Sequence, residues 1–171
     1  MTSSNPAIGI LMGSDSDWPL LQKSITTLKE FGVTFEVRVL SAHRTPDAAA
    51  KYAAEAEKRG LKIIIAAAGG AAHLAGVIAA HTVLPVIGIP VANGALNGID
   101  ALLATIQMPA GIPVATVALG SAGPANAALL AVQILAITDE SLRQKLHEFK
   151  TELSRKVEAG NSRIQEALAN L

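Results

Sequence analysis

The chain has 171 residues, half of them hydrophobic, which suffices for one hydrophobic core and favours a single catalytic domain over residues 1–171. Its 14 basic and 14 acidic residues cancel and only five residues are aromatic, which argues against a protein that tracks nucleic-acid phosphates or stacks on bases. Cysteine is absent, which excludes disulfides, thiolate metal ligands and a cysteine nucleophile and fits a cytoplasmic protein. Residues 1–6 carry no basic residue and are expected to form a flexible tail rather than a signal peptide.

The first part of the chain alternates apolar runs with helix-like segments. Residues 7–12 predict a buried parallel strand, and Asp17 is placed to cap a helix that closes at Gly32. Residues 34–40 alternate β-branched and other positions, which predicts a second strand, and an alanine-rich helix follows from Thr45 to Gly60. The fully apolar residues 63–68 then predict a third strand.

The same alternation continues in the second part of the chain. A small-residue helix is expected at 73–82, a strand at 86–89, a helix at 99–106, a strand at 114–119 and a helix at 124–137. Five strand–helix units with crossovers of helical length predict a three-layer αβα sandwich. Residues 139–171 are rich in charge, with apolar residues spaced three and four apart, and predict an amphipathic C-terminal helical extension.

Between Ile63 and Thr138 the only charged side chain is that of Asp100. A membrane protein would have such a segment, but prolines and Asn-Gly pairs interrupt it, and no apolar run approaches the ~20 residues of a spanning helix. Helices without a charged face are normally buried all round. A chain of this size cannot cover them alone, so the segment favours a homo-oligomer over a membrane protein.

Three polar loops follow the first three predicted strands, at the edge of the sheet where α/β proteins bind ligands. In residues 13–17, Ser14, Ser16 and backbone N–H groups at a helix start can bind an anion, although Asp17 or Ser16 could equally serve only as a cap. The loop is neither a P-loop nor a Rossmann fingerprint. A flavin mononucleotide site remains open on this fold, but few aromatic residues are available to sandwich the flavin ring.

The second and third loops bring in histidines, an arginine and glycines. In residues 41–46, the Arg44 guanidinium can grip a phosphate, and the His43 imidazole is the usual type of proton carrier. An ordinary surface His-Arg pair in a turn is the alternative. Gly69 and Gly70 remove bulk where the backbone must approach a ligand, and a tight strand-to-helix turn would need them nearly as much. His73 opens the next helix. No HxxxH or HxH spacing occurs, so we expect no metal site.

Taken together, these loops resemble those of the 5-(carboxyamino)imidazole ribonucleotide mutase family of purine biosynthesis. The match runs from Ile8 to roughly Leu146, and the loop at 69–74 is of the mutase type rather than that of carboxylases that use carbon dioxide directly. Ala75 and Ala110 depart from the family, which commonly has a proline and a basic residue there. The motifs that carry the resemblance are residues 12–18, 41–46, 68–74, 107–113 and 125–128.

The resemblance implies a flavodoxin-like sheet, a homo-octamer, and a reaction without metal, ATP or organic cofactor. In that reaction a carboxylate moves from the exocyclic nitrogen of aminoimidazole ribonucleotide to ring carbon 4. His43 would act as acid and then base, and His73 would shape or polarise the carboxylate pocket. A direct carboxylase, a flavodoxin-like nucleotide-binding module and a purely structural oligomer are the alternatives. The resemblance assigns ribose-phosphate binding to Ser14, Ser16, Asp17, Ser41 and Arg44, and the loop around carbon dioxide to Gly69, Gly70, Ala71 and Leu74.

Overall fold

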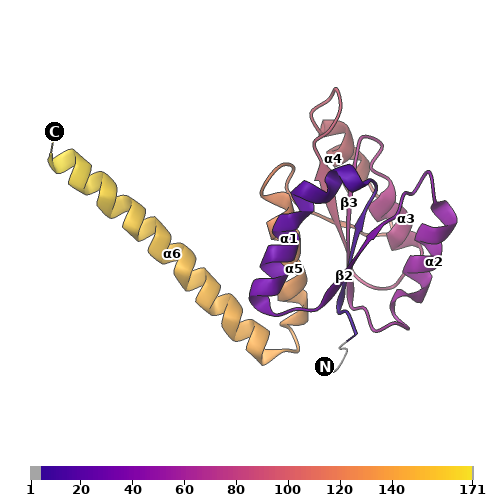
Figure 1. The fold of residues 1–171 in the computed structure, drawn as a ribbon, viewed down its shortest axis with the longest axis horizontal. Coiled ribbons are helices and arrows are strands. Elements are labelled where there is room, and N and C mark those ends of the chain that lie inside the picture. The colour runs from indigo at the N-terminus through magenta and orange to yellow at the C-terminus, as the bar shows by residue number, and fades with distance from the viewer. Residues whose placement is uncertain (1–4, 171) are drawn as a thin grey trace. The chain divides into compact units, whose positions relative to one another are not determined.

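The computed structural model describes residues 5–170, so most of the expected tail at 1–6, and Leu171 of the C-terminal helix, lie outside the described residues. The chain divides into two compact units that meet between Val132 and Gln133. In the first unit, five parallel strands form a sheet in the order β2-β1-β3-β4-β5, the flavodoxin-like order (Figure 1). The strands are β1 (Ile8–Met12), β2 (Phe35–Val39), β3 (Ile63–Gly69), β4 (Val86–Val91) and β5 (Ala115–Thr116).

Helices cover both faces of this sheet. Buried alanines of α2 and apolar residues of α3 pack with Leu11 and Ile64 in one core cluster. Gly88 of β4 lies under Ala75 of α3 and Thr105 of α4, which places α4 on that same face. On the opposite face, Ser24 of α1 donates a hydrogen bond to the Pro124 carbonyl of α5 (2.7 Å). The predicted three-layer αβα sandwich is confirmed, and Figure 1 shows α1 and α5 on one side of the strands and α2 and α3 on the other. The helices are α1 (Trp18–Phe31), α2 (Pro46–Ala56), α3 (Leu74–Ala80), α4 (Ile99–Ile106) and α5 (Gly123–Leu135), with a 3-10 turn η1 (Asp15–Asp17) before α1.

Two glycines close helices as predicted. Gly32 after α1 has φ 74° and Gly60 after α2 has φ 93°, a left-handed conformation that favours glycine. The Val33 N–H donates to the Leu28 carbonyl, and the Leu61 N–H donates to the Ala56 carbonyl. The turns of α2 therefore continue to Gly60, although the regular helix ends at Ala56. The prediction that the Asp17 side chain caps α1 is wrong. Asp17 stands at the N-cap position of α1, but its side chain makes no capping hydrogen bond there.

The fifth strand is much shorter than the predicted 114–119. Only Ala115 and Thr116 pair with β4, opposite Ile87 and Gly88. The Gly88 carbonyl accepts one more hydrogen bond, from the Val117 N–H. The next β4 residue that faces β5 is Pro90, which has no N–H to donate, and this ends the ladder.

The edge strand β2 is attached to α2 by a polar cluster. The Tyr52 hydroxyl donates to Glu36 Oε1 (2.7 Å), and Arg59 Nη1 pairs with the same oxygen (2.7 Å). The Arg59 guanidinium also stacks 4.5 Å from the Tyr52 ring centre. Burial opposes ionisation of Glu36, but the donors from Tyr52 and Arg59 outweigh it and hold the pKa of that carboxyl below its ordinary value. Burial, followed by the bond to Glu36, raises the pKa of Tyr52.

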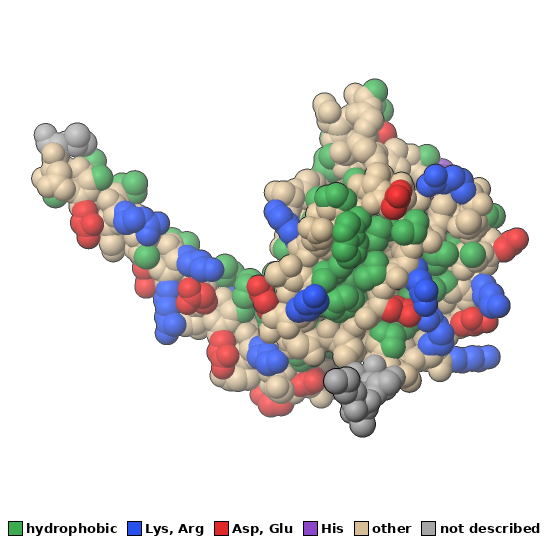
Figure 2. Space-filling model, viewed as in Figure 1, with side chains coloured by type: hydrophobic (Ala, Val, Ile, Leu, Met, Phe, Trp, Pro, Cys, Tyr) green, Lys and Arg blue, Asp and Glu red, His purple; other side chains and the backbone are tan. Residues whose placement is uncertain are grey.

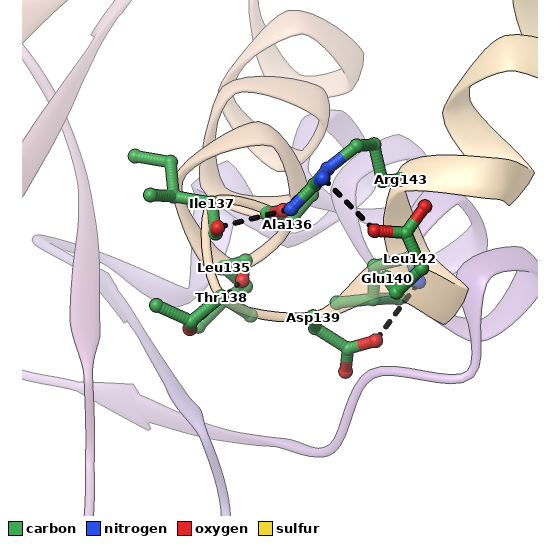
Figure 3. A network of polar contacts seen from close by, with 8 residues as sticks. All are labelled: Leu135, Ala136, Ile137, Thr138, Asp139, Glu140, Leu142 and Arg143. Carbon is green, nitrogen blue, oxygen red and sulfur yellow. Dashed lines mark hydrogen bonds and ion pairs between the residues drawn. The ribbon is translucent and has the colours of Figure 1, made fainter.

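The second unit consists of the end of α5, a turn and α6 (Glu140–Ala169). In the turn, the Asp139 carboxylate accepts from the Leu142 N–H (3.0 Å), an N-cap bond (Figure 3). Arg143 donates to the Ala136 carbonyl (3.2 Å) and pairs with Glu140 (2.9 Å), which satisfies a carbonyl at the end of α5. The predicted amphipathic C-terminal helix is therefore present, and Figure 2 shows hydrophobic side chains mainly along the upper edge of α6 and charged ones over the rest of its visible face. The single-domain organisation stays a prediction.

Candidate active site

A cavity of about 360 Å³ lies at the carboxyl edge of the sheet. The loops that leave β1, β2, β3 and β4 line it, which is where a doubly wound sheet binds its ligand. Eight of the predicted site residues line this cavity, and they come from all three polar loops. These eight are Ser14, Asp17, Ser41, His43, Arg44, Gly69, Ala71 and Leu74.

The loop after β1 contributes hydroxyls and one carboxylate. Ser16 donates its hydroxyl hydrogen to Ser14 Oγ (2.9 Å), so Ser16 supports the cavity wall without lining it. Asp17 is buried, with only 4% of its surface exposed. Burial raises the pKa of Asp17, while nearby hydrogen-bond donors and the positive charge of Arg44 oppose that rise. The loop thus places two hydroxyl groups, which here donate to Asp15 and to Ser14, beside one desolvated carboxylate, a set that suits phosphate and ribose hydroxyls.

The loop after β2 is fixed by Ser41. The Ser41 hydroxyl accepts from the backbone N–H of His43 (3.3 Å) and of Arg44 (3.1 Å) and keeps its own hydrogen available. Arg44 Nη2 donates to the Gly13 carbonyl (2.7 Å), which ties the second loop to the first. The guanidinium is therefore held in place while most of its five donors remain available for an anion.

The two predicted histidines form a pair. His43 Nε2 and His73 Nδ1 are 2.8 Å apart, and the rings meet edge to face with centres 4.9 Å apart. A hydrogen bond at this distance needs one nitrogen with a hydrogen and one with a free lone pair, so the pair is not doubly protonated in this arrangement. His73 is the N-cap residue of α3 and does not itself line the cavity. Its side chain contacts His43, which does line the cavity.

The loop after β3 makes a tight turn of small residues. Gly70 has φ 59°, a conformation that glycine adopts without strain, and two tight backbone hydrogen bonds follow, Ala72 to Gly70 and His73 to Ala71, each 2.8 Å. Gly70 shapes this turn but does not line the cavity. Ala42, Ala68 and Leu74 give the adjacent wall an apolar character.

One lining residue, Asn93, lies outside every predicted motif. It follows β4, and an Asn-Gly pair in the sequence signals only a turn. Asn93 reaches the cavity because Val91, two residues before it, pairs with Gly69 of β3. The sequence alone does not reveal this pairing. Among residues 5–170, no three His, Cys, Asp or Glu side chains cluster as metal ligands. In the same described segment, no helix has the length and hydrophobicity to span a membrane.

Comparison with known proteins identifies the family and the fold. The AIR carboxylase family matches residues 7–156. The chain belongs to this family. Relatives named N5-carboxyaminoimidazole ribonucleotide mutase include one from Pyrococcus horikoshii, 53% identical over 166 residues (97% of this chain, 93% of the relative), and one from Bacillus subtilis, 56% identical over 143 residues (84% and 88%). A crystal structure of Treponema denticola PurE matches with TM-score 0.83 and 29% identity over 92% of this chain and 98% of that one. The resemblance predicted from the motifs is confirmed.

Proposed function

We propose that this member of the AIR carboxylase family is a mutase that moves the carboxylate of N5-carboxyaminoimidazole ribonucleotide from the exocyclic nitrogen to ring carbon 4. The observation that carries the proposal is the His43–His73 pair, which joins an anion-binding end to a small-residue end within one cavity. The relatives at 53% and 56% identity, which carry this mutase name, support the same reaction.

The phosphate end of the substrate is assigned to the first two loops. Arg44 has a fixed guanidinium, and Ser41 has a hydroxyl hydrogen free to donate. The hydroxyls of Ser14 and Ser16, which here donate to Asp15 and to Ser14, turn to the phosphate when the substrate binds. Asp17 accepts from a ribose hydroxyl, a role that fits a buried carboxylate close to that arginine. These contacts bind substrate and product alike, and so orient the heterocycle toward His43.

The chemical step needs one proton to leave His43 and one to return. His43 protonates the exocyclic nitrogen as its bond to the carboxyl carbon breaks, and carbon dioxide is released with the electron pair left on nitrogen. Carbon 4, an enamine-like nucleophile, then bonds to carbon dioxide, and neutral His43 removes the ring hydrogen to restore aromaticity. Protons and charge balance over the cycle. The loop of Gly69, Gly70 and Ala71, in which Gly69 and Ala71 line the cavity and Gly70 shapes the turn, confines the carbon dioxide, so that recapture is effectively intramolecular.

His73 supports this cycle by holding the His43 ring. Its Nδ1 contacts His43 Nε2 at 2.8 Å, so it can accept or return a hydrogen as His43 changes protonation state. The carbamate already contains the carbon dioxide, and carbon 4 of the ring supplies the electron pair for the new carbon–carbon bond. Because no other reactant is needed, we propose a reaction without metal, ATP or organic cofactor.

Replacing His43 tests the proposal. We expect His43→Asn to keep the fold and the affinity for aminoimidazole ribonucleotide while kcat falls about 10²- to 10⁴-fold, the usual contribution of a general acid–base. Conversion of the carbamate ribonucleotide to the carbon-carboxylated isomer is the assay, and His147→Asn, on α6 and outside the cavity, is the matched control. A His43→Asn variant with near-normal turnover would refute the acid–base role.

The same assay separates the alternatives. A direct carboxylase would need added bicarbonate and would accept aminoimidazole ribonucleotide itself, whereas the mutase works without bicarbonate. A flavodoxin-like nucleotide carrier or a purely structural oligomer would show no turnover at all. The loop at 69–74, which resembles that of the mutases, favours the mutase reaction over direct carboxylation.

The active enzyme is further proposed to be a cytoplasmic homo-octamer with no nucleic-acid or membrane partner. Ile99, Leu103 and Ile106 form one stripe of α4 and are each more than half exposed. Leu96, just before α4, is 61% exposed. Such an apolar surface, in the segment that lacks charges, suits contact with other subunits.

A further inference from the structure

Asn93 lies across the end of strand β3. Its N–H donates to the Val91 carbonyl (3.0 Å), which bends the chain sharply after β4. Val91 pairs with Gly69 in the sheet, so this bend directs the Asn93 side chain back over Gly69. A Cβ added at Gly69 would overlap the Asn93 carboxamide. The amide therefore occupies the position that any side chain at residue 69 would take.

The carboxamide of Asn93 has no hydrogen-bond partner among residues 5–170. It is exposed and lines the cavity, so both its Oδ1 and its Nδ2 are accessible to a ligand. A carboxamide provides two donor hydrogens and one acceptor. The neighbouring wall residues Ala68, Ala71 and Leu74 offer no side-chain hydrogen bonds. Asn93 is thus the neutral polar side chain of the small-residue end of the cavity.

We propose that the Asn93 amide donates a hydrogen bond to the migrating carboxyl group, and so positions it both on nitrogen and on carbon 4. This inference rests on the proposed mutase reaction. The group is an anion at the start and the end but neutral carbon dioxide between them. A full positive charge at this place would stabilise the two anions more than the intermediate and raise the barrier between them. A neutral amide retains the group with less of that penalty and restrains its rotation.

Variants of Asn93 separate two roles of its amide: donating a hydrogen bond to the carboxyl group and filling the space over Gly69. Asn93→Ala removes both, and Asn93→Asp keeps the shape over Gly69 but replaces the donor by a carboxylate that repels the substrate. We expect Asn93→Ala to lower kcat/KM roughly 10- to 100-fold, the range for a hydrogen bond to a charged group. Asn93→Asp should be at least as impaired. Gln22→Ala, which removes an exposed carboxamide on α1 outside the cavity, is the matched control.

The most informative readout is the fate of the carbon dioxide. We expect Asn93→Ala to release more aminoimidazole ribonucleotide per turnover than the parent enzyme, because a poorly held carbon dioxide escapes before carbon 4 captures it. Affinity for aminoimidazole ribonucleotide, which has no carboxylate, should be unchanged. Circular dichroism establishes that each variant is folded.

Gly69→Ala provides an independent check through the partner of the contact. Its Cβ would displace the Asn93 amide, so the losses from Gly69→Ala and Asn93→Ala should not add in the double variant. Additive losses, an active Asn93→Asp enzyme, or unchanged partitioning in Asn93→Ala would each overturn the assignment of Asn93. Failure of the parent enzyme to convert the carbamate would instead reject the mutase proposal itself.

Discussion

Replacing Arg44 by leucine should weaken substrate binding through the phosphate and leave the chemical step largely intact. Arg44 Nη2 is committed to the Gly13 carbonyl at 2.7 Å, and its Nε lies 3.5 Å from Ser41 Oγ, a long contact. At least three of the five guanidinium hydrogens therefore remain for a phosphate. The side chain is exposed toward the cavity, so these donors are accessible.

The size of the effect follows from the hydrogen bonds to phosphate that a leucine side chain cannot make. One hydrogen bond to a charged group is worth about 1.5–3 kcal/mol, and a fork of two is not fully additive. We therefore expect KM to rise on the order of 10- to 100-fold in Arg44→Leu, with kcat changed by less than about threefold. Arg44→Lys keeps a point charge but loses the two-pronged hydrogen bonding of the guanidinium. Its KM should therefore lie between those of the parent enzyme and Arg44→Leu.

Comparing two ligands locates the loss on the phosphate. Calorimetry with aminoimidazole ribonucleotide and with its dephosphorylated ribonucleoside gives two binding free energies for each enzyme. Their difference is the contribution of the phosphate to binding. The parent enzyme should favour the ribonucleotide strongly, and Arg44→Leu should lose most of that preference while binding the ribonucleoside as before. If Arg44→Leu weakens both ligands equally, the residue supports the loop rather than the phosphate, and the assignment is wrong.

Two further predictions concern assembly and pH. Light scattering should give about eight times the 17.6 kDa of one chain, and Leu103→Glu, which places a charge in the apolar stripe of α4, should reduce that mass; a parent protein that is already monomeric would contradict the octamer. Burial raises the pKa of Asp17 above its unfolded value, so the stability it contributes at low pH is lost as pH rises through the folded pKa. Asp17→Asn should therefore have a higher Tm than the parent at pH 7, with a difference that shrinks toward pH 4, while ribonucleotide binding weakens. A lower Tm at pH 7 would contradict this sign.

Much of the fold could be predicted because its determinants are local. Apolar runs of strand length and glycines that take the left-handed conformation, such as Gly32 and Gly60, mark the elements where they occur. The length of β5 could not be predicted, because it depends on which β4 residue faces the edge. Pro90 ends the ladder only in the observed register. The missing cap at Asp17 has a different origin, since a 3-10 turn precedes α1 and its cap is Ser14, whose hydroxyl accepts from the Ser16 N–H.

The site shows the same division between local and long-range information. The loop sequences predicted that Ser14, His43 and Arg44 belong to the site, because a hydroxyl, an imidazole and a guanidinium each indicate a kind of chemistry. The contact between His43 and His73, which are 30 residues apart, required the β1–β3 and β1–β2 pairings. Asn93 required the β3–β4 register and has no chemical signature of its own in the sequence.

The loop that carries His43 and Arg44 is held at both ends by the polar cluster on β2. The loop leaves the end of β2 and enters α2, and Tyr52 of α2 is bonded to Glu36 of β2. The Tyr52 hydroxyl also lies against Gly9 of β1, where a Cβ would collide with it. Edge strand, helix and central strand are thereby fixed to one another. Catalytic groups must be held within about 0.5 Å of their working positions, and an edge strand paired on one side only does not provide that alone. The Glu36–Tyr52–Arg59 cluster supplies the missing constraint from outside the cavity, on the strand and helix that flank the loop carrying His43 and Arg44.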